Sequence, residues 1–194
     1  AEALLWDYLD TGAMYRSTSL AIHRAGVDMA DGPALQQLLD GLELGQDGTR
    51  ISLNGENVSE AIRTPEVTRL VTPVSADPRV REVLVKQQRR LGKRGRWVVD
   101  GRDIGTVVFP DARLKIFMVA TVEARASRRW REIQAKGNAI SLEQVKADLE
   151  RRDHADMTRA VSPLRKADDA FEVDTSHLNL HEVVEEIVLL YRGL

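Results

Sequence analysis

The sequence contains no cysteine, and this absence excludes several kinds of chemistry. A chain without thiols forms no disulfide, holds no iron–sulfur cluster and has no thiolate nucleophile. The sequence also shows no apolar run of membrane-spanning length, no visible signal peptide and no ligand spacing among its four histidines. From these absences we expect a cytoplasmic protein without a membrane segment or a zinc site.

An excess of charge of one sign is also absent. The formal net charge is -2 over 194 residues, so no global basic field attracts nucleic acid or an anionic membrane. The hydrophobic fraction of 43% and the charged fraction of 30% are ordinary for a globular protein, and the length suits one substantial domain. Function must therefore come from local clusters of charge.

Short apolar runs separated by helical patterns indicate the fold class. Strands are predicted at Trp97–Asp100, Leu114–Val119 and Phe171–Asp174. Helices are predicted from about Val122 to Lys136, from Ser141 onward and after a cap at Asn179. The first two strands are apolar enough to be buried on both faces. This alternation predicts βαβ units, and hence an α/β three-layer sandwich with a mostly parallel sheet.

The first half of the chain carries helix boundaries and one hairpin signal. A helix is predicted to end at Gly26, and others to begin after the capping residues Asp31, Thr64 and Asp77, each followed closely by proline. Asn54-Gly55 between short alternating runs predicts a hairpin, so a small antiparallel patch near residues 42–58 forms an insertion. The opening residues Ala1–Trp6 have the pattern of the last turns of a helix.

The segment Asp100-Gly101-Arg102-Asp103 follows directly on a predicted buried strand. Ligands of parallel sheets bind at the carboxyl ends of strands, and Gly101 leaves room for close approach. Arg102 is poorly placed for core packing, which favours phosphate binding over a structural ion pair with Asp103 or Asp100. Asp100 suits either an Mg²⁺-directed carboxylate or a cap or loop hydrogen bond.

Thr11 and Arg16 lie at the start of the first predicted helix. Threonine ahead of a helix offers a hydroxyl and backbone N–H groups to an anion, and Arg16 could add a bidentate phosphate contact. A capped helix with a surface arginine explains the same residues equally well.

Two basic helical stretches also have two interpretations each. They are the face formed by Arg152, Asp156 and Arg159, and the set Arg125, Arg128, Arg129 and Arg131. The first suits a lid that closes over phosphates, and the second suits phosphate binding. Solvated faces of amphipathic helices are the alternative for both.

Eight segments carry these features together. They are Leu9–Arg16, Asn54–Ser59, Ile62–Val67, Pro78–Arg81, Asp100–Ala112, Lys115–Phe117, Arg151–His154 and Thr158–Leu164. In type and order they resemble bacterial cytidylate kinase, a nucleoside monophosphate kinase family, from the first residues to the last helix. The long central motif is far more specific than a lone glycine motif.

The resemblance implies a P-loop nucleoside monophosphate kinase fold in a single kinase domain. Its core would lie at about residues 1–37, 75–146 and 164–194, its monophosphate-binding insertion at about 38–74 and its lid at about 147–163. The implied reaction transfers the γ-phosphoryl group of ATP to CMP or dCMP, giving CDP or dCDP, with Mg²⁺ as cofactor. The resemblance also favours a cytoplasmic monomer without nucleic-acid or membrane partners.

The resemblance also implies roles for residues at matching positions. The acceptor phosphate would be clamped by Arg16, Arg102 and Arg159, with Thr11 beside them. The cytosine edge would be read by Thr72, Arg81 and Asp103, and the ribose bound by Arg152 and Asp156. The donor phosphates would be assisted by Arg125, Arg128 and Arg129, and Mg²⁺ by Asp100. Such a set suits phosphoryl transfer, which needs positioning and charge neutralisation.

Two features depart from the family pattern. Thr72 stands where serine is common, and Pro73 after it is expected to kink or end its helix. No G-x-x-x-x-G-K-[ST] sequence, the loop that cradles ATP phosphates, occurs in the 194 residues. In the family this loop and its strand lie immediately upstream of the helix that Ala1 would continue. We therefore expect the chain either to be truncated or to be part of a longer sequence.

Two other functions remain open from the sequence. A P-loop kinase for another monophosphate, such as UMP or AMP, would differ at the base-reading residues. A non-catalytic CMP-binding module is favoured by the missing loop. The otherwise complete acceptor set disfavours it, because unused arginines drawn together cost solvation and stability.

An intact mass near 21.7 kDa would show that the polypeptide lacks the loop. We then expect it to bind CMP weakly and to form no ADP, because no loop would hold the ATP phosphates. Calorimetry with CMP and a coupled ADP assay test this expectation. Measurable ADP formation from ATP and CMP by this chain would contradict it.

Overall fold

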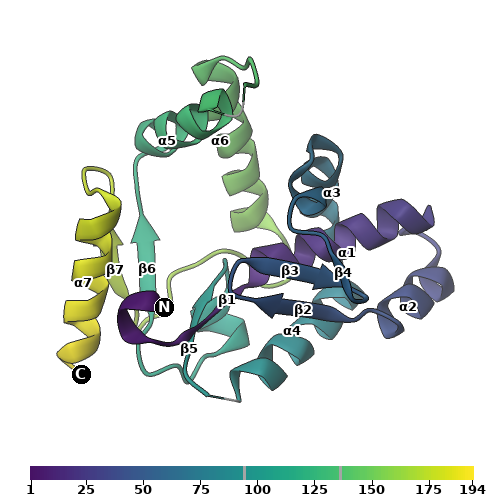
Figure 1. Ribbon diagram of the computed structural model, residues 1–194, viewed down its shortest axis with the longest axis horizontal. Helices are drawn as coiled ribbons and strands as arrows, with labels where there is room; N and C mark the ends of the chain where they lie inside the picture. Colours follow the sequence, from purple (N-terminus) through teal and green to yellow (C-terminus); the bar gives the residue numbers. More distant parts are fainter. Residues whose placement is uncertain (94, 136) are drawn as a thin grey trace. The chain divides into compact units, whose positions relative to one another are not determined.

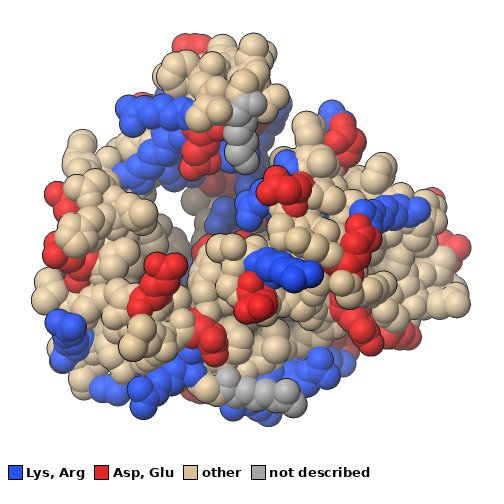
Figure 2. Space-filling view, in the orientation of Figure 1, with Lys and Arg blue, Asp and Glu red and all other residues tan. Residues whose placement is uncertain are grey.

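The computed structural model describes residues 1–93, 95–135 and 137–194. These residues form two compact units, unit 1 (Ala1–Ile104) and unit 2 (Gly105–Leu194), each with its own parallel strands and helices (Figure 1). Among the described helices, none is both long and apolar enough to cross a bilayer. Figure 2 shows Lys and Arg interspersed with Asp and Glu over the visible face of unit 1, in keeping with the small net charge.

Unit 1 is built on a parallel pair of strands, β1 (Asp7–Asp10) and β5 (Trp97–Asp100). Between them in sequence come four helices, α1 (Thr11–Ala25), α2 (Gly32–Asp40), α3 (Pro65–Ala76) and α4 (Pro78–Gly92). The antiparallel insertion consists of β2 (Leu44–Asp47), β3 (Arg50–Leu53) and β4 (Glu56–Asn57), followed by a 3-10 turn, η2 (Ala61–Arg63). The parallel pair and the insertion confirm the α/β class with a small antiparallel patch.

The helix boundaries follow local capping chemistry. The side chains of Asp31, Thr64 and Asp77 accept hydrogen bonds from backbone N–H groups in the first turns of α2, α3 and α4, which confirms the predicted caps. Asp10 caps α1 in the same way, through Ala13 N. Gly26 ends α1 with a φ of 63°, a left-handed conformation that glycine adopts without strain.

The predicted hairpin is confirmed at Asn54-Gly55, which joins β3 to β4. Both residues have positive φ, 50° and 82°, as the tight turn between right-twisted strands requires. The preceding strand β2 begins at Leu44, later than the predicted run from Leu42. Leu42 is buried in the core instead, just ahead of the strand.

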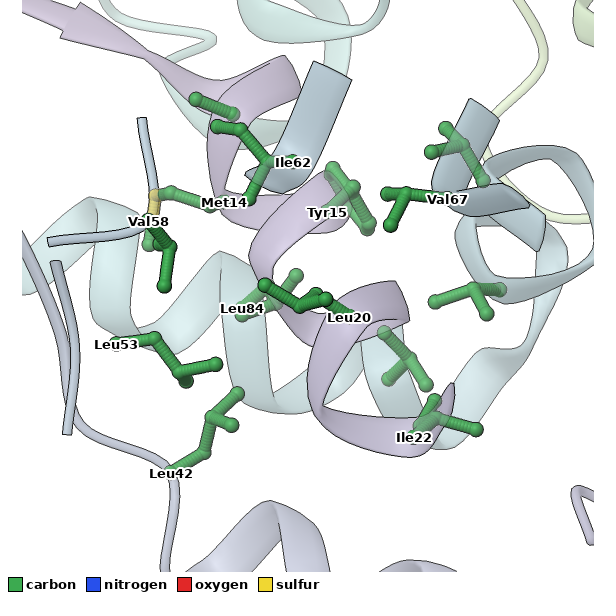
Figure 3. Packing of buried hydrophobic residues seen from close by; sticks show 14 of the residues in the cluster. Met14, Tyr15, Leu20, Ile22, Leu42, Leu53, Val58, Ile62, Val67 and Leu84 are labelled. Carbon is green, nitrogen blue, oxygen red and sulfur yellow. The ribbon is translucent and has the colours of Figure 1, made fainter. Parts of the chain in front are cut away.

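The core of unit 1 lies around α1. Figure 3 shows Met14 and Tyr15 of α1 among Val58, Ile62 and Val67, which come from the insertion and α3. The apolar side chains of α3 and β3 therefore dock directly on α1, which also packs against α4 (Figure 1). This packing fixes the insertion against the helix that begins at Thr11.

Unit 2 contains a second parallel pair, β6 (Ile116–Val119) and β7 (Phe171–Asp174). Its helices are α5 (Val122–Ala135), α6 (Leu142–Thr158) and α7 (Leu180–Arg192), and α5 packs against α6 (Figure 1). Reciprocal capping boxes begin α6 at Ser141 and α7 at Asn179, which confirms both predicted starts. Lys136, the predicted end of α5, lies outside the described residues.

Two local expectations were wrong, and a third was wrong in part. The expectation that Pro73 ends its helix was wrong, because α3 continues past it to Ala76, where the proline is exposed and Val67, Val71 and Val74 keep one helix face buried. Ala1–Trp6 holds a single 3-10 turn, η1 (Glu2–Leu4), ended by the left-handed Leu5 rather than the end of an α-helix. The strands β5 and β6 are only half-buried, with Met118 53% exposed, because each belongs to a two-stranded sheet in the described part of the chain.

The Asp77 cap gives a pH-dependent contribution to stability. Its carboxylate accepts from Arg79 N at 2.9 Å and pairs with Arg79 Nη2 at 2.6 Å. The hydrogen bonds from Arg79 hold the pKa of Asp77 below its usual value. Because the folded-state pKa is depressed, this stabilisation is present above the unfolded pKa of about 3.9 and is lost as pH falls through the folded pKa.

We expect Asp77→Asn to lower the free energy of unfolding by about 0.5 kcal/mol at pH 7, since asparagine keeps the cap but loses the solvent-screened ion pair. The deficit should shrink as the pH is lowered toward 3, as urea denaturation would measure. Asp31→Asn at the exposed cap of α2 is the matched control. A deficit of equal size at both pH values would contradict this assignment.

Candidate functional site

The carboxyl ends of β1 and β5 bring two polar segments together in unit 1. The register pairs Asp10 with Asp100, and Thr11 Oγ1 donates a hydrogen bond of 2.6 Å to the carbonyl of Asp100. A Cβ on Gly101 would collide with Thr11 Oγ1, so only glycine permits this approach. The two segments predicted from the sequence therefore meet at one edge of the sheet, next to the N-terminus of α1. Asp10, Thr11, Asp100 and Gly101 form what we call the strand-end cluster.

Arg16 lies beyond this cluster on α1, and its guanidinium is directed toward η2 and α3. Its Nη1 donates to Thr68 Oγ1 at 3.0 Å and to the carbonyl of Ile62 at 3.2 Å. The side chain of Arg16 is half-buried. Of its two acceptors, Thr68 belongs to α3 and Ile62 to η2. Arg16 is thus held between α1 and the segments η2 and α3.

Arg81 of α4 and Asp103 form a buried ion pair between Arg81 Nη2 and Asp103 Oδ2. The residues are 3% and 5% exposed, and Arg81 Nη1 also donates to the carbonyl of Ser75 at 3.3 Å. The guanidinium lies over the ring of Tyr15, 5.6 Å from its centroid, within cation–π range. The structure therefore brings together two of the three predicted base-reading residues.

The three remaining site residues that the sequence predicts in unit 1 are exposed. Thr72 lies on α3, Arg102 follows Gly101, and Asp100 ends β5. The Tyr8 hydroxyl donates to Asp100 Oδ2 at 3.4 Å. Burial first, and then the charge of Asp100, raise the pKa of Tyr8, so its hydroxyl stays protonated and remains a donor.

In unit 2, Arg152 and Asp156 lie on α6, and Arg159 follows it. The expectation that all three share a helical face was wrong for Arg159, because α6 ends at Thr158 and Arg159 is extended with a ψ of 141°. Arg159 nevertheless bends back: its Nη1 is 3.7 Å from Asp156 Oδ1, and its Nε donates to the carbonyl of Ser162 at 2.6 Å. The left-handed Ser162 permits this turn.

Of the four arginines of α5, the three predicted to assist the donor phosphates each contact other protein groups. Arg125 pairs with Asp153 at 2.5 Å, and Arg129 pairs with Glu132 at 2.9 Å. Arg128 donates to the carbonyl groups of Thr175 and Leu178, so it fastens the loop after β7. Their role toward donor phosphates stays a prediction.

The structure adds polar residues that the sequence patterns did not indicate. Gln46 Oε1 accepts from the backbone N–H of Asp10 at 3.0 Å, which ties the insertion to the end of β1. Thr68 and Tyr8 contact Arg16 and Asp100, as described above. None of these residues lies in a recognisable motif, so only the packing of distant segments reveals them.

The strand-end cluster, the helix N-terminus and the arginines around it define an α/β protein of the nucleotide-binding class. A family profile described as cytidylate kinase matches residues 1–192. The chain belongs to the cytidylate kinase family.

Curated relatives match almost the whole chain. It is 52% identical over 188 residues to a cytidylate kinase of Rhodococcus opacus (strain B4), covering 94% of this chain and 82% of that protein. A Bacillus cereus cytidylate kinase is 45% identical over 198 residues, covering 100% of this chain and 88% of that protein. A bifunctional pantoate ligase/cytidylate kinase of Synechococcus sp. (strain JA-3-3Ab) is 51% identical over 195 residues. The chain covers 36% of the length of that bifunctional relative.

We expect Asp103→Asn to lower the free energy of unfolding by about 3 kcal/mol, because it leaves the buried guanidinium of Arg81 without its counter-charge. Urea denaturation followed by circular dichroism would measure the loss. Glu56→Gln, which removes the exposed partner of Arg24, is the control and should change little. Equal losses of unfolding free energy for the two substitutions would show that the buried Arg81–Asp103 pair matters no more to stability than an exposed pair.

Proposed function

We propose that the protein is a nucleoside monophosphate kinase that transfers the γ-phosphoryl group of ATP to CMP or dCMP, giving CDP or dCDP. The observation that carries the proposal is the buried pairing of Arg81 with Asp103 beside the strand-end cluster of unit 1. Membership of the cytidylate kinase family supports the same reaction.

The Arg81–Asp103 pair offers the two functions that a cytosine edge needs. Cytosine presents an N4 amino donor next to acceptors at N3 and O2, so a carboxylate and a guanidinium side by side complement it. Uracil presents an acceptor where cytosine has the amino group, and a carboxylate there would meet another acceptor. The adjacent pair therefore favours CMP over UMP, with Thr72 as the third proposed base contact.

The acceptor phosphate is proposed to be bound by Arg16 and Arg102 of unit 1 and by Arg159 of unit 2, with Thr11 contributing its hydroxyl. Guanidinium groups suit phosphate because they donate two parallel hydrogen bonds and keep their charge. Their chemical task is to hold the acceptor and to neutralise charge that develops on the transferred group.

The ribose is proposed to be bound by Arg152 and Asp156 of α6. The contacts of Arg159 with Asp156 and Ser162 support a preformed turn after this helix. The segment at about residues 147–163 is proposed to act as the lid, residues 38–74 as the monophosphate-binding insertion and the remainder as the core of one kinase domain. A cytoplasmic, monomeric state is proposed with them.

The proposed cofactor is Mg²⁺, brought with ATP. Mg²⁺ prefers oxygen ligands and is commonly held by one or two carboxylates together with substrate phosphates. The exposed carboxylate of Asp100 at the end of β5, oriented by Tyr8, fits such a ligand. Bound Mg²⁺ would supply positive charge on the ATP phosphates. Arg125, Arg128 and Arg129 are the proposed donor-phosphate contacts.

Comparing CMP, dCMP, UMP and AMP as acceptors tests the proposal. For the natural protein we expect kcat/KM values for CMP and dCMP at least about tenfold above those for UMP and AMP. This factor is what one mispaired polar contact in a buried site costs. The same order should hold for binding of the monophosphates to the 194-residue chain.

The outcomes separate the alternatives. A clear preference for UMP or AMP would refute the cytidine assignment. Binding of CMP by the natural protein without turnover would indicate a binding module instead of an enzyme. The substitution Arg81→Lys should reduce the preference for CMP, because lysine lacks the planar fork that pairs with Asp103.

A further inference from the structure

Packing of apolar side chains holds α3 against α1 and fixes the spacing of the two helices. Tyr15 and Val67 are 7% and 1% exposed, and Figure 3 shows them close together, with Ile62 beside Met14. The next residue along each helix is polar: Arg16 follows Tyr15, and Thr68 follows Val67. Core packing between the helices therefore sets the distance between these two polar side chains.

Two acceptors converge on a single nitrogen of Arg16. Thr68 Oγ1 lies 3.0 Å from Arg16 Nη1, and the carbonyl oxygen of Ile62 lies 3.2 Å from the same atom. One acceptor is a side chain on α3 and the other is backbone in η2, so they approach from different elements. Two such contacts restrict rotation about the long arginine side chain, which otherwise has many conformations.

We propose that Thr68 is a positioning residue whose hydroxyl, together with the carbonyl of Ile62, orients Arg16 for the acceptor phosphate. This inference rests on the proposed function, in which Arg16 binds that phosphate. Holding the guanidinium in place before the ligand arrives reduces the conformational entropy lost on binding. Thr68 acts only through Arg16 and makes no contact with substrate in this scheme.

The scheme predicts which ligands depend on Thr68. CMP carries the phosphate that Arg16 would bind, whereas cytidine has the same base and sugar without it. Loss of the Thr68 hydroxyl should therefore weaken CMP binding and leave cytidine binding unchanged. A general disturbance of the insertion would weaken both.

The substitution Thr68→Val removes the hydroxyl at nearly constant shape, on an exposed position where valine and threonine have similar helix propensities. Calorimetry on the 194-residue chain would compare CMP with cytidine. We expect the Kd for CMP to rise about threefold to tenfold, the effect of one hydrogen bond to a charged group. Thr68→Ser, which keeps the hydroxyl, should restore CMP affinity to within about twofold of the original.

The matched control is Thr49→Val, the same exchange at an exposed turn between β2 and β3, which should leave both affinities unchanged. A double-mutant cycle completes the test. In an Arg16→Met background, Thr68→Val should weaken CMP binding by less than about twofold, because the group that it positions is gone. Melting temperatures of all variants check that each is folded.

Three outcomes overturn the inference. These are no effect of Thr68→Val on CMP, an equal effect on CMP and cytidine, or an undiminished effect in the Arg16→Met background. If Arg16→Met weakens CMP binding and any of these three results is also found, only the role of Thr68 is refuted. The proposed role of Arg16 then stands. A chain that does not bind CMP, or that binds it equally well after Arg16→Met, would refute the proposed function and this inference with it.

Discussion

The candidate site of unit 1 depends on the parallel pairing of β1 with β5. Its register sets Asp10 opposite Asp100, so that both polar segments leave the sheet at the same edge. The hydrogen bond from Thr11 to the carbonyl of Asp100 then closes the start of α1 onto the end of β5. A shift of one residue in this pairing would turn every side chain of the strand to the other face and separate these groups. The positions of Arg16 and Arg81 follow from the helices that this pairing anchors.

Much of the fold could be predicted from the sequence because it depends on short-range chemistry. The Asp31, Thr64 and Asp77 caps and the Asn54-Gly55 turn each involve a few neighbouring residues whose conformational preferences are strong. The strand before Asp100-Gly101-Arg102-Asp103 was recognisable for the same reason. The family resemblance supplied the assignment of roles to residues, which local patterns alone left divided between binding and structural explanations.

What could not be predicted depends on contacts between distant segments. Pro73 suggests a helix end to any local rule, yet tertiary burial of α3 carries the helix past it. Arg159 matches a helical spacing, but Ser162 and the bonds back to α6 place it in a turn. Gln46 and Thr68 have no motif at all, and their importance arises from acceptors placed beside Asp10 and Arg16 by the packing of the insertion. Local propensity cannot anticipate such partners.

The contact between Gln46 and Asp10 has a consequence for the sheet itself. Asp7 donates its N–H toward the β5 side, to Arg96, so the alternation of the strand turns the N–H of Asp10 outward. An outward N–H is an attachment point for a strand from another molecule, and edge strands that offer several of them promote association. Gln46 occupies this position with its amide oxygen. The side chain therefore satisfies an outward N–H at the end of β1 and leaves one hydrogen-bond donor fewer on that margin of the sheet.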